Sequence, residues 1–147
     1  VEYICSMKLK QVSLEQLNAL NEGTLMEALN IEYIEIGPDF VKASMPVSHQ
    51  VKQPMGLLHG GASAALMETV GSLGSVLLID PETHYSVGLE ISANHVAAAK
   101  EGMVIATAKL VHGGRKTHLW NIEVRDAQTD RLISHGKHTV MVLPKED

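Results

Sequence analysis

The chain has 147 residues and a net charge of -5, with 45% apolar and 20% charged residues. This length and composition are typical of one globular domain, and the acidic balance argues against binding nucleic acid through a basic surface. The single cysteine, Cys5, excludes an intramolecular disulfide and favours a reducing cytoplasm as the compartment.

The N-terminal stretch VEYICSMKLKQ has no basic segment followed by a long apolar run, so we expect no secretory signal. Residues 1–12 are expected to be a disordered or cloning-derived leader, with Met7 as the natural first residue. Residues 13–147 are expected to form a single domain, because no repeat, linker or change of composition interrupts them.

Two short helices and a hairpin are predicted in the first third of the domain. Ser13 can cap a helix in SLEQLNALN, with Gln16 at the capping-box position, and GTLMEALN follows as a second helical piece. IEYIEIG and DFVKASMPV then alternate around GPD, which indicates a hairpin. After the loop VSHQVKQPM, a long apolar helix is predicted from about Gly60 to Ile79, ending before Pro81.

The rest of the chain has the character of strands joined by short turns with Gly or Asp. The four segments are SVGLEISANHV, MVIATAKLV, THLWNIEVRD and LISHGKHTVMVL. With the hairpin they predict an α+β fold of about six antiparallel strands and one long helix, and not a doubly wound sheet. A helix that is apolar on nearly all sides must be covered, so we expect the sheet to curve around it.

Glu68 is the one charged residue of the long helix. Ala64, Glu68 and Ser72 are four residues apart and share a helix face, so the Ser72 hydroxyl can lie beside the carboxylate. A carboxylate at the middle of a bilayer costs roughly 2.5 kcal/mol or more, so this helix is not expected to span a membrane. We expect the carboxylate to be desolvated, as in a site for general base or nucleophilic catalysis.

The start of the same helix carries His59, Gly60 and Gly61. Backbone N–H groups are unpaired at a helix N-terminus, where they can stabilise an oxyanion, and glycine lets a substrate approach the backbone. Gln53, on the preceding loop, can return to the same place. The alternative from the residues alone is that Glu68 faces solvent or pairs with a lysine and that the glycines only form a turn, and the two interpretations are close to even.

The chain resembles a known enzyme family at several motifs. These are the run QPMGLLHGG at residues 53–61, Glu68, Gly71-Ser72, VGLEISANHV and GGRKTHLWNIEV. Together they are similar to the hotdog-fold acyl-CoA thioesterases, in the branch of the 4-hydroxybenzoyl-CoA, enterobactin proofreading and 1,4-dihydroxy-2-naphthoyl-CoA thioesterases. The resemblance covers nearly all of the chain beyond Met7.

The resemblance implies a curved antiparallel sheet around the long helix and hydrolysis of an aromatic acyl-CoA. Glu68 would be the nucleophile or general base, and the Gly60 N–H would hold the thioester oxygen with help from His59 or Gln53. Ser72 would position the water or Glu68. The active sites would lie at a dimer interface, two dimers would form a homotetramer, and no metal or redox cofactor would be needed.

The CoA moiety is expected to bind near the segment HGGRKTH, where a turn can present amides and cations to phosphate. The candidate contacts are His95, Gly114, Arg115, Lys116 and Thr117. A plain hairpin turn with solvated charges is the alternative, and it is the one the sequence alone favours. Ala97 and Ala98 stand where the relatives have Arg and Ser, which puts nucleotide contacts there in doubt.

Eight histidines raise the question of a metal site. His135 and His138 are three residues apart on a predicted strand and so point to opposite faces, and His112 and His118 lie on either side of a turn. No familiar zinc spacing is present, so we expect no metal.

Other functions stay open at this stage. The rivals are a thioesterase for short- or medium-chain aliphatic acyl-CoA or for a carrier protein, and a non-catalytic acyl-CoA-binding module. A hydratase of the same fold would need a His and an Asp on the helix, where this chain has Glu68. A binding module has no need for a buried carboxylate, so Glu68 discriminates between it and an enzyme.

Overall fold

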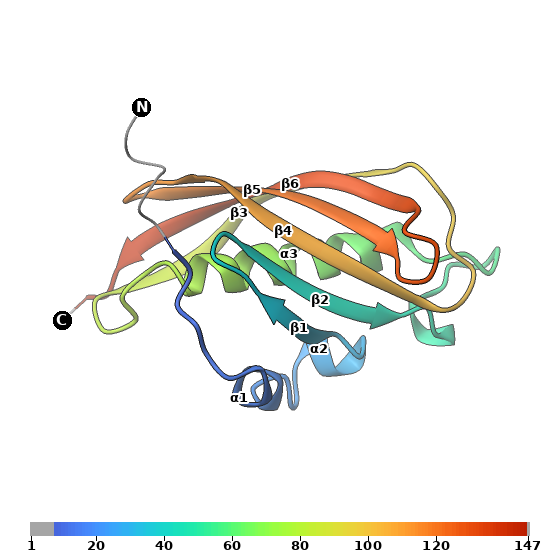
Figure 1. Ribbon diagram of the computed structural model, residues 1–147, viewed down its shortest axis with the longest axis horizontal. Coiled ribbons are helices and arrows are strands. Elements are labelled where there is room, and N and C mark those ends of the chain that lie inside the picture. Colours follow the sequence, from blue (N-terminus) through green and yellow to red (C-terminus); the bar gives the residue numbers. More distant parts are fainter. Residues whose placement is uncertain (1–7, 147) are drawn as a thin grey trace.

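The computed structural model describes residues 8–146. Its six antiparallel strands are β1 (Glu32–Ile36), β2 (Phe40–Pro46), β3 (His84–His95), β4 (Met103–Gly113), β5 (Thr117–Asp126) and β6 (Leu132–Pro144). They form one sheet in the order β1-β2-β4-β5-β6-β3. The sheet curves over a single long helix, α3 (Gly60–Val76), as Figure 1 shows. The predicted α+β fold is confirmed, and the helix ends slightly before the predicted Ile79.

Two short helices, α1 (Leu14–Ala19) and α2 (Leu25–Ala28), lie beside β1 (Figure 1). The Ser13 hydroxyl accepts a hydrogen bond from the Gln16 N–H at 3.3 Å, which confirms the predicted cap. Asn18 joins α1 to β1, because its amide accepts from the Tyr33 N–H at 2.8 Å and donates to the Tyr33 carbonyl at 3.0 Å. The α1–α2 segment is therefore fastened to the outer edge of the sheet.

The predicted leader lies only partly within the described residues, since residues 1–7 fall outside them. Leu9 is 3% exposed, and its N–H donates to the Pro38 carbonyl at 2.9 Å. The Lys10 N–H donates to the Leu77 carbonyl at 3.1 Å. The contacts of the domain therefore begin before Ser13, because a leucine and two backbone groups of the expected leader are already part of it.

Glycines on α3 allow the helix to lie close to the sheet. A Cβ atom at Gly74 would overlap the ring of Trp120. This ring is fully buried, and its indole N–H donates to the Ser75 hydroxyl at 2.8 Å, so it cannot move aside without losing a buried hydrogen bond. The glycine thus sets the distance between α3 and β5.

We expect Gly74→Val to lower the free energy of unfolding by about 2 kcal/mol, because overpacking a close-packed interface costs this much. Urea unfolding followed by circular dichroism at one protein concentration measures the change. Ala19→Val, at an exposed helical position, introduces the same β-branched side chain without the overlap and is expected to cost much less. Equal losses for the two variants would contradict the close approach.

Strand β3 is the edge of the sheet next to β6. It is 12 residues long, and its register with β6 shifts between Gly88 and Glu90, which marks a β-bulge. Tyr85, Val87 and Leu89 alternate along it and are 40–51% exposed. A long edge strand with exposed apolar side chains is a surface suited to pairing with another chain.

Between residues 8 and 146, no helix combines the length and the hydropathy needed to cross a membrane.

Candidate active site

The start of α3 presents an unpaired backbone N–H. His59 is the N-cap, and its Nδ1 accepts from the Gly61 N–H at 2.8 Å. The Ala62 and Ser63 N–H groups donate to the His59 carbonyl. The Gly60 N–H has no acceptor among residues 8–146, so it can bind an oxygen of a ligand.

Two further polar side chains meet at this helix start. The Gln53 side-chain oxygen accepts from the Met55 N–H, which leaves its amide NH₂ available as a donor. The His95 ring lies over Gly60, where a Cβ would be 2.6 Å from its Nε2, and its Nδ1 shares a hydrogen bond of 2.8 Å with the Ser134 hydroxyl. Gln53, Gly60 and His95 line a common cavity of about 380 Å³.

The position of His95 differs from the one expected for it. The prediction from the sequence is a CoA contact together with the β4–β5 turn, whereas the structure places His95 beside Gly60 and Gln53. The end of β3 meets the start of α3 only because β3 runs back along the helix. His95 and Gly60 are far apart in the sequence, so local residue patterns could not predict that they lie side by side.

Glu68 lies in the middle of α3 and points over β3. Its Oε1 is 2.7 Å from the place that a Cβ of Gly88 would occupy, so the glycine on β3 makes room for the carboxylate. The expectation of a buried carboxylate is wrong for a single chain, because Glu68 is exposed there. It is not held by a lysine or arginine either, since the ion pairs found in residues 8–146 do not include it.

Ser72 shares the helix face of Glu68, as predicted, but its hydroxyl has a partner that the sequence analysis missed. Its Oγ is 3.1 Å from Nε2 of His138, and the Nδ1 of His138 is 2.9 Å from the Glu90 carbonyl oxygen. His138 is fully buried, whereas His135 is exposed, so their predicted orientation to opposite faces is confirmed. The period of two along β6 could have indicated that His138 faces the helix.

Glu68 and Ser72 line a cavity of about 480 Å³ on the outer side of α3. The opposite wall comes from α1, α2 and β1, and its side chains are mostly apolar: Leu17, Leu20, Leu25, Met26 and Tyr33. Burial raises the pKa of Tyr33 to about 12, so the phenol keeps its proton at neutral pH. The cavity is therefore an uncharged, apolar space that opens beside one carboxylate.

The two polar regions of α3 cannot act on the same atom within one chain. Gly60 and Glu68 are eight residues apart, which is about 12 Å along a helix at 1.5 Å per residue. A general base and an oxyanion donor must both lie about 3 Å from a reacting carbonyl group. One chain thus carries two half-sites, one at the helix start and one at its middle.

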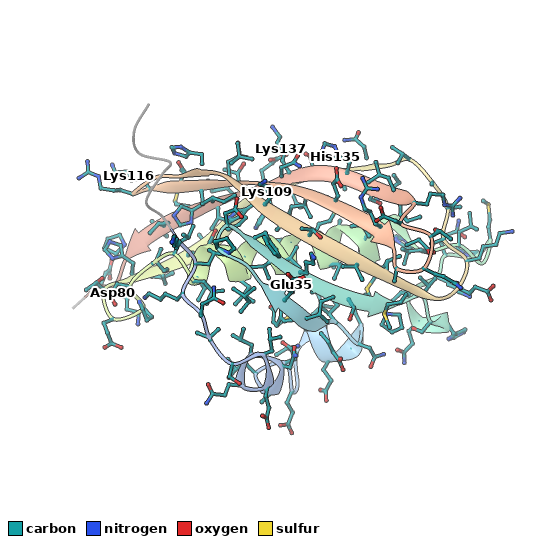
Figure 2. All side chains as sticks on the ribbon, in the orientation of Figure 1. Glu35, Asp80, Lys109, Lys116, His135 and Lys137 are labelled. Atoms are coloured by element: carbon teal, nitrogen blue, oxygen red, sulfur yellow. The ribbon has the colours of Figure 1, made fainter. Side chains whose placement is uncertain are left out.

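The predicted CoA contacts are also separated within one chain. Residues 114–116 form the turn between β4 and β5, closed by a hydrogen bond of 2.9 Å from the Gly114 N–H to the carbonyl of Thr117, the first residue of β5. Thr117 pairs with Met141 of β6 and His95 pairs with Ser134, so they are about 24 Å apart along the strand. Figure 2 shows Lys116 at the end of the molecule where Asp80 follows α3, with His135 farther along the sheet.

In the part of the chain that the structure describes, no group of three or more His, Cys, Asp or Glu side chains is placed to hold a metal ion.

The sequence model of the protein family described as the thioesterase superfamily matches residues 55–133, which is more than half of the chain. The chain is 42% identical to the 1,4-dihydroxy-2-naphthoyl-CoA hydrolase of Escherichia coli, over 91% of this chain and 97% of that protein. It is 45% identical to the proofreading thioesterase EntH of Cronobacter turicensis, over 90% and 96% of the two chains.

The fold is also that of solved thioesterases. A mutant thioesterase from Pseudomonas aeruginosa superposes with a TM-score of 0.91 at 37% identity, over 95% of this chain and all of that one. A thioesterase from Haemophilus influenzae gives 0.89 at 37% identity, over 94% and 95% of the two chains. The curved sheet around α3 is the hotdog fold expected from the sequence motifs. The chain belongs to the thioesterase superfamily and is a thioester hydrolase.

Proposed function

We propose that the enzyme hydrolyses an aromatic acyl-CoA thioester, of the hydroxybenzoyl or dihydroxynaphthoyl kind, to the free acid and CoA. The observation that carries this proposal is the Glu68 carboxylate at the edge of the apolar cavity of about 480 Å³. Cavities of roughly 300–1,000 Å³ suit small organic ligands, so there is room for one or two aromatic rings. The named activity of the E. coli relative, on a naphthoyl-CoA, supports the same class of substrate.

The complete site is proposed to form between two chains. Because Gly60 and Glu68 of one helix lie about 12 Å apart, Glu68 has to meet Gly60 of the partner subunit. The exposed edge of β3 next to Glu68, with its apolar side chains, is the surface that we propose for this contact. Burial of the exposed carboxylate would then occur on assembly, and two such dimers would form the homotetramer.

In this site the donors at the start of one helix act on the thioester oxygen. The Gly60 N–H and the Gln53 amide are available to donate, and His59 or His95 can add a third hydrogen bond. Glu68 of the other chain takes a proton from water, and the water oxygen bonds to the carbonyl carbon. When the tetrahedral intermediate collapses, the C–S bond breaks, and the departing CoA thiolate takes up the proton that Glu68 holds. Direct attack by the Glu68 carboxylate, followed by hydrolysis of the anhydride, uses the same groups.

The CoA moiety is proposed to contact His95 and residues 114–117. Because these lie about 24 Å apart along β6, we propose that they contact one CoA from two different chains. Gly114, Arg115, Lys116 and Thr117 thus stay proposed contacts that depend on the assembly. We expect no cofactor other than the CoA of the substrate, and the cytoplasm as the compartment.

A substrate screen tests the proposed function. We expect kcat/KM for benzoyl-CoA and hydroxybenzoyl-CoA to exceed that for hexanoyl-CoA by roughly 10-fold or more, because a rigid ring fills the apolar cavity better than a flexible chain. Thiol release under identical conditions measures each rate, with the same benzoyl group on an acyl carrier protein as a further substrate. Higher kcat/KM for hexanoyl-CoA or for the carrier-bound substrate would favour the corresponding rival, and no turnover of any of these substrates would reject the proposed substrate class.

A further inference from the structure

We propose that His138 is a positioning residue that makes the Ser72 hydroxyl an acceptor for the hydrolytic water. This inference rests on the proposed function, in which Glu68 activates a water. A chain of hydrogen bonds links Ser72 of the catalytic helix to two groups on the sheet, His138 of β6 and the Glu90 carbonyl of β3. The Glu90 carbonyl, the His138 ring and the Ser72 hydroxyl follow one another at 2.9 and 3.1 Å.

The direction of these hydrogen bonds follows from the chemistry of the three groups. A peptide carbonyl can only accept, so Nδ1 of His138 must carry a proton and donate it to Glu90. A fully buried imidazolium is costly, and the ion pairs formed by residues 8–146 do not include His138, so we infer a neutral ring. Its Nε2 is then an acceptor, and the Ser72 O–H must donate to it.

This hydrogen-bond direction determines what the Ser72 oxygen can offer to the cavity. Once its proton points to His138, the Ser72 oxygen can offer only lone pairs to the cavity that it lines with Glu68. A water between Ser72 and Glu68 therefore donates one hydrogen to each of them. Its own lone pair is left to face the thioester carbon, which is the orientation that attack requires.

Gly88 supports this arrangement from β3. A Cβ at Gly88 would lie 2.7 Å from Oε1 of Glu68 and 3.0 Å from Cε1 of His138. The carboxylate and the imidazole thus lie on either side of one glycine, at the β-bulge that also supplies the Glu90 carbonyl. The strand fixes the imidazole by a hydrogen bond and leaves space for the carboxylate.

The state of the His138 ring is tested by long-range proton–nitrogen NMR on protein labelled with ¹⁵N-histidine. We expect His138 to be the tautomer protonated at Nδ1, with an unprotonated Nε2 whose resonance shifts in Ser72→Ala. A tautomer protonated at Nε2, or a doubly protonated ring, would overturn the inference. This measurement needs no substrate, so it decides the hydrogen-bond direction even if wild-type protein hydrolyses no acyl-CoA and the proposed function fails.

The effect on catalysis is tested by a double-mutant cycle with benzoyl-CoA. We expect Ser72→Ala to lower kcat roughly 10- to 100-fold with little change in KM, since it removes an orienting contact to water. His138→Asn keeps a donor at the place of Nδ1 for Glu90 but has no atom at the place of Nε2 to accept from Ser72, and it should lower kcat to a similar extent. His138→Gln restores an acceptor and should recover part of the rate. His135→Gln, on the outer face of the same strand, is the control and should leave kcat unchanged.

The cycle separates a positioning role from a structural one. If His138 acts through Ser72, His138→Asn should cause no further loss in the Ser72→Ala background. Losses that multiply in the double variant, or equal rates for His138→Asn and the wild type, would overturn the proposal.

Discussion

Glu68→Ala is expected to lower kcat/KM for the preferred acyl-CoA by about 10³-fold, because it removes the group that accepts the proton from water. The fold should persist, since the side chain is exposed in the single chain and belongs to no ion pair of the described residues. Release of CoA thiol, measured together with circular dichroism, separates loss of chemistry from loss of structure.

Glu101→Ala is the matched control, because it removes an exposed carboxylate in the loop between β3 and β4 and should leave the rate unchanged. A Glu68→Ala enzyme that retains the wild-type rate would disprove the mechanism. A single turnover in heavy-oxygen water then tests for the nucleophilic role of Glu68. Label in the Glu68 carboxylate indicates a nucleophile whose anhydride is opened at the Glu68 carbonyl, because general-base catalysis leaves Glu68 unlabelled.

Two inactive variants are expected to restore activity when they share one dimer. Gln53→Ala removes a donor at the start of α3 and should cost ~100-fold in rate, and Glu68→Ala removes the base. In a dimer with one variant in each chain, one of the two sites has both groups intact. It combines Gln53 of the Glu68→Ala chain with Glu68 of the Gln53→Ala chain. Such a heterodimer, isolated by two different affinity tags, should show about half of the wild-type rate.

The same heterodimer tests whether Gln53 and Glu68 of one site come from two chains or from one. If Gln53 and Glu68 acted within one chain, both sites of the heterodimer would lack one group, and the heterodimer would be as inactive as its parents. A monomer by light scattering at the assay concentration would also contradict the shared site. Homodimers of each variant, purified with the same tags, are the controls.

The fold could be predicted from the sequence because its signals are local. The cap at Ser13, the hairpin before Pro46 and the alternating strands each depend on residues close together in the chain. The same holds for Glu68 and Ser72, which share a face because they are four residues apart. Local spacing therefore recovered the elements and the face of the helix that carries the carboxylate.

The partners of these residues could not be predicted, because they depend on how distant segments meet. His138 reaches Ser72 across 66 positions of sequence, and His95 reaches Gly60 only through the return of β3. The exposure of Glu68 has a similar cause, since the apolar composition of its helix says nothing about whether one chain or two cover it. Pairing across the sheet and between chains has to be seen in three dimensions.

The two walls of the cavity beside Glu68 come from different parts of the chain, and they have different roles. The wall that carries Glu68 and Ser72 belongs to α3, which packs closely on the sheet, for example where Gly74 contacts Trp120. The opposite wall belongs largely to α1 and α2, which are joined to β1 through the side chain of Asn18. Substitutions at Leu20 and Leu25, the exposed cavity-lining residues of this segment, can reshape the space for the acyl group without removing a side chain of the core or a hydrolytic group. Substrate preference is therefore expected to respond to changes in α1 and α2, while α3 retains the hydrolytic groups.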